Sequence, residues 1–233
     1  MGDVQKARLA AVNEALKYFE GRRLIGLGTG STTELLIREA HKADLLRGRE
    51  LVASSVETAE VLAGLGYKVV DMLSIEGLEL YLDSADEIDR EGRMIKGGGA
   101  ALTTEKLLAR HAKLRVFFVD EFKVVERLGV RNPVPLEVLP SALRMILNDL
   151  TKLGISVSVR KGSGKRGPVV SDVGGVIVDA ILPSSMSLED FERYVKSLTG
   201  VIEVGLFLNE ADVVIIGRED GGAEYLKRVY QLT

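Results

Sequence analysis

A glycine- and hydroxyl-rich turn between an apolar segment and a helix-like segment is the feature that most constrains the fold of this chain. The apolar run Arg23–Leu27 leads into the turn Gly28–Thr33, and a helix-like segment begins at Glu34. Backbone N–H groups at the start of a helix have no partner within it, and the helix dipole attracts negative charge to them. The turn predicts a strand–turn–helix unit that binds a small anion. The structural alternative is a tight turn with a hydroxyl cap.

Apolar runs and helix-like segments alternate along the first half of the chain. The expected helices are 4–19, 57–65 and 100–112, and the expected strands are 23–27, 50–54, 68–70, 78–82 and 115–119. Strands that alternate with helices favour an α/β protein with an open, mostly parallel, Rossmann-like sheet and helices on both of its faces.

The pattern changes near residue 132 and then follows the order of a ferredoxin-like α+β unit. The expected strands are 134–139, 155–160, 175–181 and 201–206, and the expected helices are 140–153 and 188–198. The order β-α-β-β-α-β is that of the split βαβ motif. The basic tract Arg160–Arg166 between two of these strands is expected to be a solvated hairpin tip, and contact with a phosphate is the alternative.

The end of the chain returns to the first sheet. Residues 212–217 are expected to add one more strand, followed by a short helix that ends near Tyr230. The sequence thus predicts an α/β domain of residues 1–132 and 208–233, with an inserted α+β domain of residues 133–207.

Composition excludes several classes of protein. The 233 residues include 31 Lys and Arg against 34 Asp and Glu, a balance that argues against a nucleic-acid-binding protein. The absence of cysteine excludes a disulfide scaffold, a thiolate nucleophile and a cysteine-ligated metal. The sequence shows neither the apolar run of a signal peptide nor that of a membrane span. We expect a cytoplasmic globular protein without nucleic-acid or membrane partners.

Two further segments place charged groups at the ends of expected strands. The acidic turn Asp83–Glu87 follows the strand 78–82, and open α/β sheets have their sites at the carboxyl ends of their strands. The segment Lys96–Gly99 ends in three glycines, which let another group approach the backbone closely, and Glu105 follows early in the next helix. A cation beside an anion-binding loop, with a carboxylate in reach, suits a reaction that makes a negative oxygen from a sugar carbonyl. The structural alternatives are a solvated acidic turn and a helix-capping loop.

These turns fit a small phosphate better than a dinucleotide or a metal. The Gly-Lys-Ser/Thr sequence of a nucleotide-binding P-loop is absent. Thr33 stands where a dinucleotide fingerprint needs Gly or Ala, and the strand 50–54 ends in Ser54 and Ser55 rather than in an acid. No cluster of His, Asp and Glu has metal-ligand spacing, so we expect neither a metal nor a cofactor.

Four motifs together resemble the motif series of the type A ribose-5-phosphate isomerase family. They are Gly26–Thr32, Asp83–Glu87, Lys96–Lys106 and Val119–Lys123, in the order and spacing of the family. The likeness runs nearly end to end and includes the segments 133–140 and 200–207.

The resemblance implies interconversion of D-ribose 5-phosphate and D-ribulose 5-phosphate through an enediolate, in the non-oxidative pentose phosphate pathway and without metal or cofactor. The residue matching Glu105 would be the general base between C1 and C2. Asp83, with Asp86 alongside, would move hydroxyl protons, and Lys96 would stabilise the oxyanion. The residues implied to bind the sugar phosphate are Thr29, Gly30, Ser31, Thr32, Ser84, Ala85, Gly97, Gly98, Gly99 and Lys123. The resemblance also implies a lid-like inserted domain and a homodimer or homotetramer.

Two positions depart from the family pattern, and alternatives stay open. Ser84 stands where Gly is common, and Thr104 stands where Arg is frequent, so one cation near the site is absent. A basic residue near the N-terminus, Lys6 or Arg8, is left unassigned. The main alternative is a sugar-phosphate-binding regulatory module, which usually carries a helix-turn-helix that we do not find before Gly26. A second alternative is an acyl-CoA transferase-like enzyme with a glutamate nucleophile.

Overall fold

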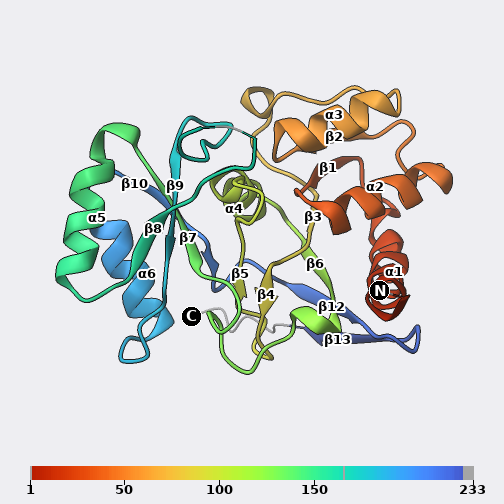
Figure 1. Cartoon of the computed structure of the whole chain (residues 1–233). Coiled ribbons are helices and arrows are strands. Elements are labelled where there is room, and N and C mark those ends of the chain that lie inside the picture. Colours follow the sequence, from red (N-terminus) through yellow and green to blue (C-terminus); the bar gives the residue numbers. More distant parts are fainter. Residues whose placement is uncertain (1, 165, 228–233) are drawn as a thin grey trace.

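The computed structural model describes residues 2–164 and 166–227, and its largest sheet has six strands (Figure 1). In spatial order they are β13 (Ala223–Lys227), β12 (Val213–Gly217), β6 (Arg115–Asp120), β3 (Leu80–Asp83), β1 (Leu24–Leu27) and β2 (Glu50–Ala53). Neighbouring strands are parallel except for β12 and β13. The open, mostly parallel sheet predicted from the sequence is confirmed.

Helices cover both faces of this sheet (Figure 1). The α-helices are α1 (Gly2–Leu16), α2 (Ser31–Lys42), α3 (Val56–Gly64), α4 (Leu102–Arg110), α5 (Leu143–Lys152) and α6 (Leu188–Ser197). Short 3-10 helices occur at Lys17–Phe19, Met72–Ser74, Glu121–Lys123 and Pro140–Ala142. None of the described helices is long and apolar enough to cross a lipid bilayer.

Alternate residues of each central strand pack into different cores. On β6, Val116 and Phe118 face the core shared with α1, α2 and α3, whereas Phe117 and Val119 face the core shared with α4. Successive side chains of a strand point to opposite faces of its sheet, so a strand covered on both faces needs a continuous apolar run. This requirement explains why the strands appear in the sequence as unbroken apolar segments.

A small antiparallel sheet lies between the large sheet and the second half of the chain. Its order is β11 (Leu206–Phe207), β5 (Met94–Ile95) and β4 (Glu87–Ile88). The N–H of Lys96, just after β5, donates to the carbonyl of Gly205 at 2.9 Å. This sheet therefore holds the start of the Lys96–Gly99 segment in place.

The second half of the chain forms a four-stranded antiparallel sheet with α5 and α6 packed against it (Figure 1). In spatial order its strands are β10 (Val201–Val204), β7 (Val134–Val138), β9 (Val176–Ala180) and β8 (Val157–Val159). Chain order and spatial order together give the ferredoxin-like unit predicted from the sequence. The division into residues 1–132 with 208–233 and residues 133–207 stays a prediction, because Ile95 and Leu128 also pack into the core of this unit.

The predicted helix at the end of the chain is wrong for residues 223–227, which form β13 instead. Arg218 and Gly222 close a tight turn by a hydrogen bond of 2.9 Å, and Gly221 in this turn has a φ of +92° that favours glycine. The turn reverses the chain so that β13 pairs antiparallel with β12. Tyr230, where the helix was expected to end, lies outside the described residues.

Other predicted elements have shorter or different bounds. Residues 68–70 make a single bridge from Val69 to Leu51 rather than a strand. Leu206, expected in the last strand of the inserted unit, pairs instead with Ile95 in the small sheet.

The core of the ferredoxin-like unit provides a test of the packing. Leu150 of α5 is fully buried, and we expect Leu150→Ala to lower the free energy of unfolding by about 2–5 kcal/mol. Leu73, which is 96% exposed, is the matched control, and Leu73→Ala should change stability by less than about 0.5 kcal/mol. Urea unfolding of both variants checks the prediction, and equal effects would contradict it.

Candidate active site

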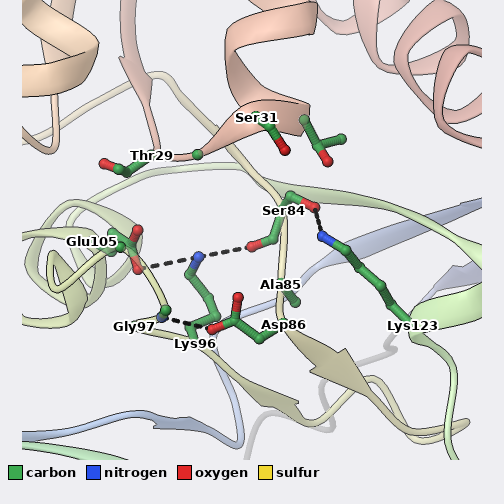
Figure 2. Close-up of a pocket in the computed structure, with 13 residues that line it drawn as sticks. Thr29, Ser31, Ser84, Ala85, Asp86, Lys96, Gly97, Glu105 and Lys123 are labelled. Atoms are coloured by element: carbon green, nitrogen blue, oxygen red, sulfur yellow. Dashed lines mark hydrogen bonds and ion pairs between the residues drawn. The ribbon is translucent and has the colours of Figure 1, made fainter. Parts of the chain in front are cut away.

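A pocket opens where the carboxyl ends of β1 and β3 meet the N-termini of α2 and α4 (Figure 2). Its lining residues are Thr29, Gly30, Ser31, Thr32, Ser84, Ala85, Asp86, Lys96, Gly97, Gly98, Gly99, Glu105 and Lys123. The structure thus brings every predicted site residue except Asp83 to one pocket. Asp83 lies behind Lys96, fully buried. The roles of these residues stay predictions.

The first turn of α2 forms one wall of the pocket. Gly30 is the N-cap of α2 and has no side chain that could accept a hydrogen bond from the first N–H groups of the helix. The residues of this first turn line the pocket. The Thr32 hydroxyl is buried and has no hydrogen-bond partner in the described part of the chain. A Cβ at position 28 would lie 1.9 Å from the Asp83 carboxylate, which explains the glycine there. This wall offers donors to an anion.

Lys96 occupies the floor of the pocket between two carboxylates. Its Nζ lies 2.7 Å from Asp83 Oδ2 and 3.1 Å from Glu105 Oε2, and it donates to the Ser84 carbonyl at 2.7 Å. Burial alone would lower the pKa of Lys96, but the charges of Asp83 and Glu105 outweigh that effect and raise it. The side chain therefore stays an ammonium.

Glu105 is a buried carboxyl group with a strongly perturbed pKa. It lies in the first turn of α4, where only 2% of its surface is exposed. Burial raises its pKa to about 8, with Lys96 opposing the shift and Asp83 adding to it. A carboxyl group with a pKa near neutrality is suited to take up and release protons.

Asp83 and Asp86 have different surroundings although they lie in one turn. Asp83 accepts hydrogen bonds from the Tyr81 hydroxyl and the Ser84 N–H, both at 2.7 Å, and it does not line the pocket. Asp86 lines the pocket and accepts from the Gly98 N–H at 2.8 Å (Figure 2). Of the two carboxylates, Asp86 is the one in reach of a bound molecule.

Positive charge collects at the side of the pocket away from Glu105. Lys123 donates to the Ser84 hydroxyl at 3.3 Å, so the departure at position 84 adds a hydroxyl to the wall (Figure 2). Burial lowers the pKa of Lys123, and the Asp120 carboxylate opposes this shift. Arg8, left unassigned from the sequence, lies with its Nε 3.8 Å from Asp120 Oδ2. Lys123 and the first turn of α2 line this end of the pocket, which we call the anion-binding end for its positive charge and helix N-terminus.

The other departure, Thr104, points away from the pocket. Its hydroxyl donates to the carbonyls of Ser54 and Ala101, and Thr104 therefore ties α4 to the end of β2. The pocket lining contains no arginine in place of the one that is frequent at position 104. Among the described residues, no group of three or more His, Cys, Asp and Glu side chains is placed to hold a metal ion.

Two residues that contact the site were missed from the sequence. Arg160, expected in a solvated hairpin tip, is bound instead: it donates to the carbonyls of Gly97 at 2.7 Å and Gly98 at 3.1 Å. No sequence pattern indicates this contact of Arg160, because the contact depends on how the two halves of the chain pack. The position of Tyr81 could have been predicted, since it lies two residues before Asp83 on one strand and thus on the same face of the sheet.

An open α/β sheet with an anion-binding helix N-terminus beside a buried acid–lysine cluster is typical of an enzyme that acts on a small anionic substrate. Comparison with known proteins narrows this class. The family model of ribose 5-phosphate isomerase A (phosphoriboisomerase A) matches residues 50–221, and the chain belongs to that family.

Relatives and solved structures match nearly the whole chain. The ribose-5-phosphate isomerase A of Aeropyrum pernix is 44% identical over 204 residues, covering 87% of this chain and 86% of the relative. That of Methanococcus aeolicus is 38% identical over 224 residues, covering 95% and 94%.

Two solved isomerases share the fold. A D-ribose-5-phosphate isomerase in complex with phospho-erythronic acid superposes with a TM-score of 0.90 at 35% identity, covering 97% of this chain and 99% of that chain. The ribose 5-phosphate isomerase A of Methanocaldococcus jannaschii superposes with a TM-score of 0.88 at 32% identity, covering 96% and 99%.

Proposed function

We propose that the chain interconverts D-ribose 5-phosphate and D-ribulose 5-phosphate through an enediolate, with Glu105 as the general base. The observation that carries this proposal is the buried ammonium of Lys96 held between Asp83 and Glu105 in a pocket that also contains a helix N-terminus. Family membership supports ribose 5-phosphate as the substrate, since the relatives are named ribose-5-phosphate isomerases. One similar isomerase was solved with a phosphorylated sugar acid.

The phosphate of the substrate binds at the anion-binding end of the pocket. The N–H groups of the first turn of α2 and the ammonium of Lys123 provide donors and positive charge there. Arg8 adds positive charge near Lys123. A phosphate anchored at this end directs the carbonyl end of a five-carbon chain towards Lys96 and Glu105 (Figure 2).

Glu105 removes the proton from C2 of the open-chain aldose and returns it to C1. Carbon acids beside a carbonyl are weak, so a carboxylate base works best when its pKa approaches the working pH, as burial achieves for Glu105. As the C–H bond breaks, its electron pair forms the C1–C2 double bond and the carbonyl electrons move to oxygen. Lys96 stabilises the negative oxygen that forms.

A hydroxyl proton must also move between the two oxygens of the enediolate. The resemblance assigns this step to Asp83 with Asp86 alongside. The donors around Asp83 occupy its oxygens, whereas Asp86 lines the pocket. We therefore assign the exchange of hydroxyl protons to Asp86 and the fixing of Lys96 to Asp83.

The reaction is proposed to belong to the non-oxidative pentose phosphate pathway, to need neither metal nor cofactor, and to take place in the cytoplasm in a homodimer or homotetramer. A sugar-phosphate-binding regulatory module would need only the anion-binding end of the pocket, whereas this pocket also contains the buried pair of Lys96 and Glu105.

Metal removal tests the proposed reaction directly. We expect the purified chain, stripped of metal and assayed with a chelator, to convert ribose 5-phosphate to a ketose phosphate at its full rate. Ketose formation is followed by absorbance of a ketose-specific product. Activity that appears only after addition of a divalent cation would contradict the metal-independent scheme, and no activity under either condition would contradict the function.

Replacement of the proposed base is the second test. Glu105→Gln keeps the shape of the side chain but removes the basic oxygen, so kcat should fall roughly 100- to 10,000-fold while the substrate still binds. The control is Glu57→Gln, which changes an exposed glutamate in the first turn of α3 and should leave kcat unchanged. Near-normal turnover in Glu105→Gln would refute the assignment.

The pH dependence of the rate is the third test. The base must be ionised, and burial raises the pKa of Glu105 to about 8, so kcat/KM should rise with pH and level off above about 8. The rise should have a slope of about one per pH unit well below that value. A rate that stays constant between about pH 6 and about pH 8 would show that Glu105 does not titrate there.

A further inference from the structure

The hydroxyl of Tyr81 contacts the acid–lysine cluster from inside the protein. Tyr81 is fully buried on β3, and its hydroxyl donates to Asp83 Oδ2 at 2.7 Å. The same oxygen lies 2.7 Å from Lys96 Nζ. The proposed reaction assigns Tyr81 no part, and the side chain does not line the pocket.

Asp83 is held by donors on both of its oxygens. Oδ1 accepts from the Ser84 N–H at 2.7 Å and from the Thr33 hydroxyl at 3.2 Å. Oδ2 is shared by Tyr81 and Lys96. A carboxylate fixed by donors on every side holds its ion pair in one geometry, which an unassisted carboxylate does not do.

We propose that Tyr81 is a positioning residue that acts through Asp83 to set where Lys96 lies relative to Glu105. The proposal rests on the proposed function, because the position of Lys96 matters for the oxygen that becomes negative during isomerisation. Tyr81 takes no part in proton transfer and does not contact the substrate.

Packing of the Tyr81 ring holds its hydroxyl beside Asp83. The ring meets that of Phe117 edge to face at 6.1 Å, and Phe117 meets Phe207 in the same way at 6.4 Å. Lys96 Nζ lies 5.9 Å and 5.5 Å from the centres of these two phenylalanine rings. The aromatic cluster therefore positions the phenol and supports the ammonium together.

The groups that face the phenol keep it a donor. Asp83 on its own strand and Glu105 on α4 have this effect, whereas the Ser54 hydroxyl after β2 opposes it. Burial, followed by the negative charges of Asp83 and Glu105, raises the pKa of Tyr81 well above its ordinary value. The hydroxyl thus stays protonated over the range in which Glu105 titrates.

Loss of the phenol has two consequences at the site. Asp83 Oδ2 then has Lys96 without a second donor, so the ammonium moves towards Asp83 and away from the reacting oxygen. The donor dipole near the carboxylates is also lost, so the potential at Glu105 becomes more negative and its pKa rises. The first effect lowers kcat, and the second moves the acid limb of the rate profile to higher pH.

Tyr81→Phe tests the proposal with the loss of one oxygen atom. Hydrogen bonds to charged groups have net strengths that correspond to roughly 10- to 100-fold in rate, so kcat should fall by about that factor. KM should change less than about threefold, because the substitution leaves the anion-binding end of the pocket intact. The acid limb of kcat/KM should move to higher pH than in the wild type. Tyr67→Phe, which removes a hydroxyl bonded to His41 Nδ1 at 2.8 Å away from the pocket, is the matched control and should change neither.

A double-mutant cycle tests whether Tyr81 acts through Asp83. In an Asp83→Asn background, Tyr81→Phe should change kcat less than about twofold further, because its target has been altered. A fall in kcat without movement of the acid limb, or an equal fall in both backgrounds, would show that the hydroxyl does not act through Asp83 and would overturn the proposal. Unchanged kcat in Tyr81→Phe would also overturn it. An inactive wild-type chain would refute the proposed function itself. The proposal on Tyr81 is refuted separately, by the rates of the variants relative to an active wild type.

Discussion

The burial of one ammonium group between two carboxylates is the interaction on which the rest of this site depends. A charge taken out of water costs several kcal/mol unless close partners and hydrogen bonds offset the loss of solvation. Lys96 has both kinds of partner: Asp83 and Glu105 supply negative charge, and the Ser84 carbonyl accepts a hydrogen bond. Asp83 and Ser84 lie at the end of β3, Lys96 follows β5 and Glu105 is on α4, so the cluster forms only when these segments pack together.

The two halves of the chain both contribute to holding that cluster. The parallel sheet places Asp83 at the end of β3, and the small sheet fixes the backbone of Lys96 against Gly205. The ferredoxin-like unit contacts the same region: Arg160 donates to the Gly97 carbonyl, and Lys106 of α4 donates to the Val204 carbonyl at 2.6 Å. The second unit thus orients α4, which carries Glu105, as well as the glycine segment.

Much of the fold and most of the pocket could be predicted from the sequence because the signals are local. The turn Gly28–Thr33 shows its strand–turn–helix character within a few residues, and strand ends in a parallel sheet meet at one edge. The β13 strand was missed because its five residues carry no strong period and depend on pairing with β12. The contact of Arg160 was missed because it spans two units, and no pattern within either one reports it.

The difference between Asp83 and Asp86 also lay beyond the sequence. Both residues appear as exposed acids in one short turn, but Asp83 is fully buried and saturated with donors, whereas Asp86 opens to the pocket. Counting the donors around a carboxylate requires the packed structure. The proposed division of labour, in which Asp83 fixes Lys96 and Asp86 exchanges protons, follows from that count.

A crystal structure of this chain with 4-phospho-erythronic acid would test the central claim most directly, because this ligand carries a phosphate at one end and a carboxylate at the other. The account predicts the phosphate at the first turn of α2 beside Lys123, and the carboxylate within hydrogen-bond distance of Lys96. A ligand bound in the opposite direction, or outside the pocket, would contradict it.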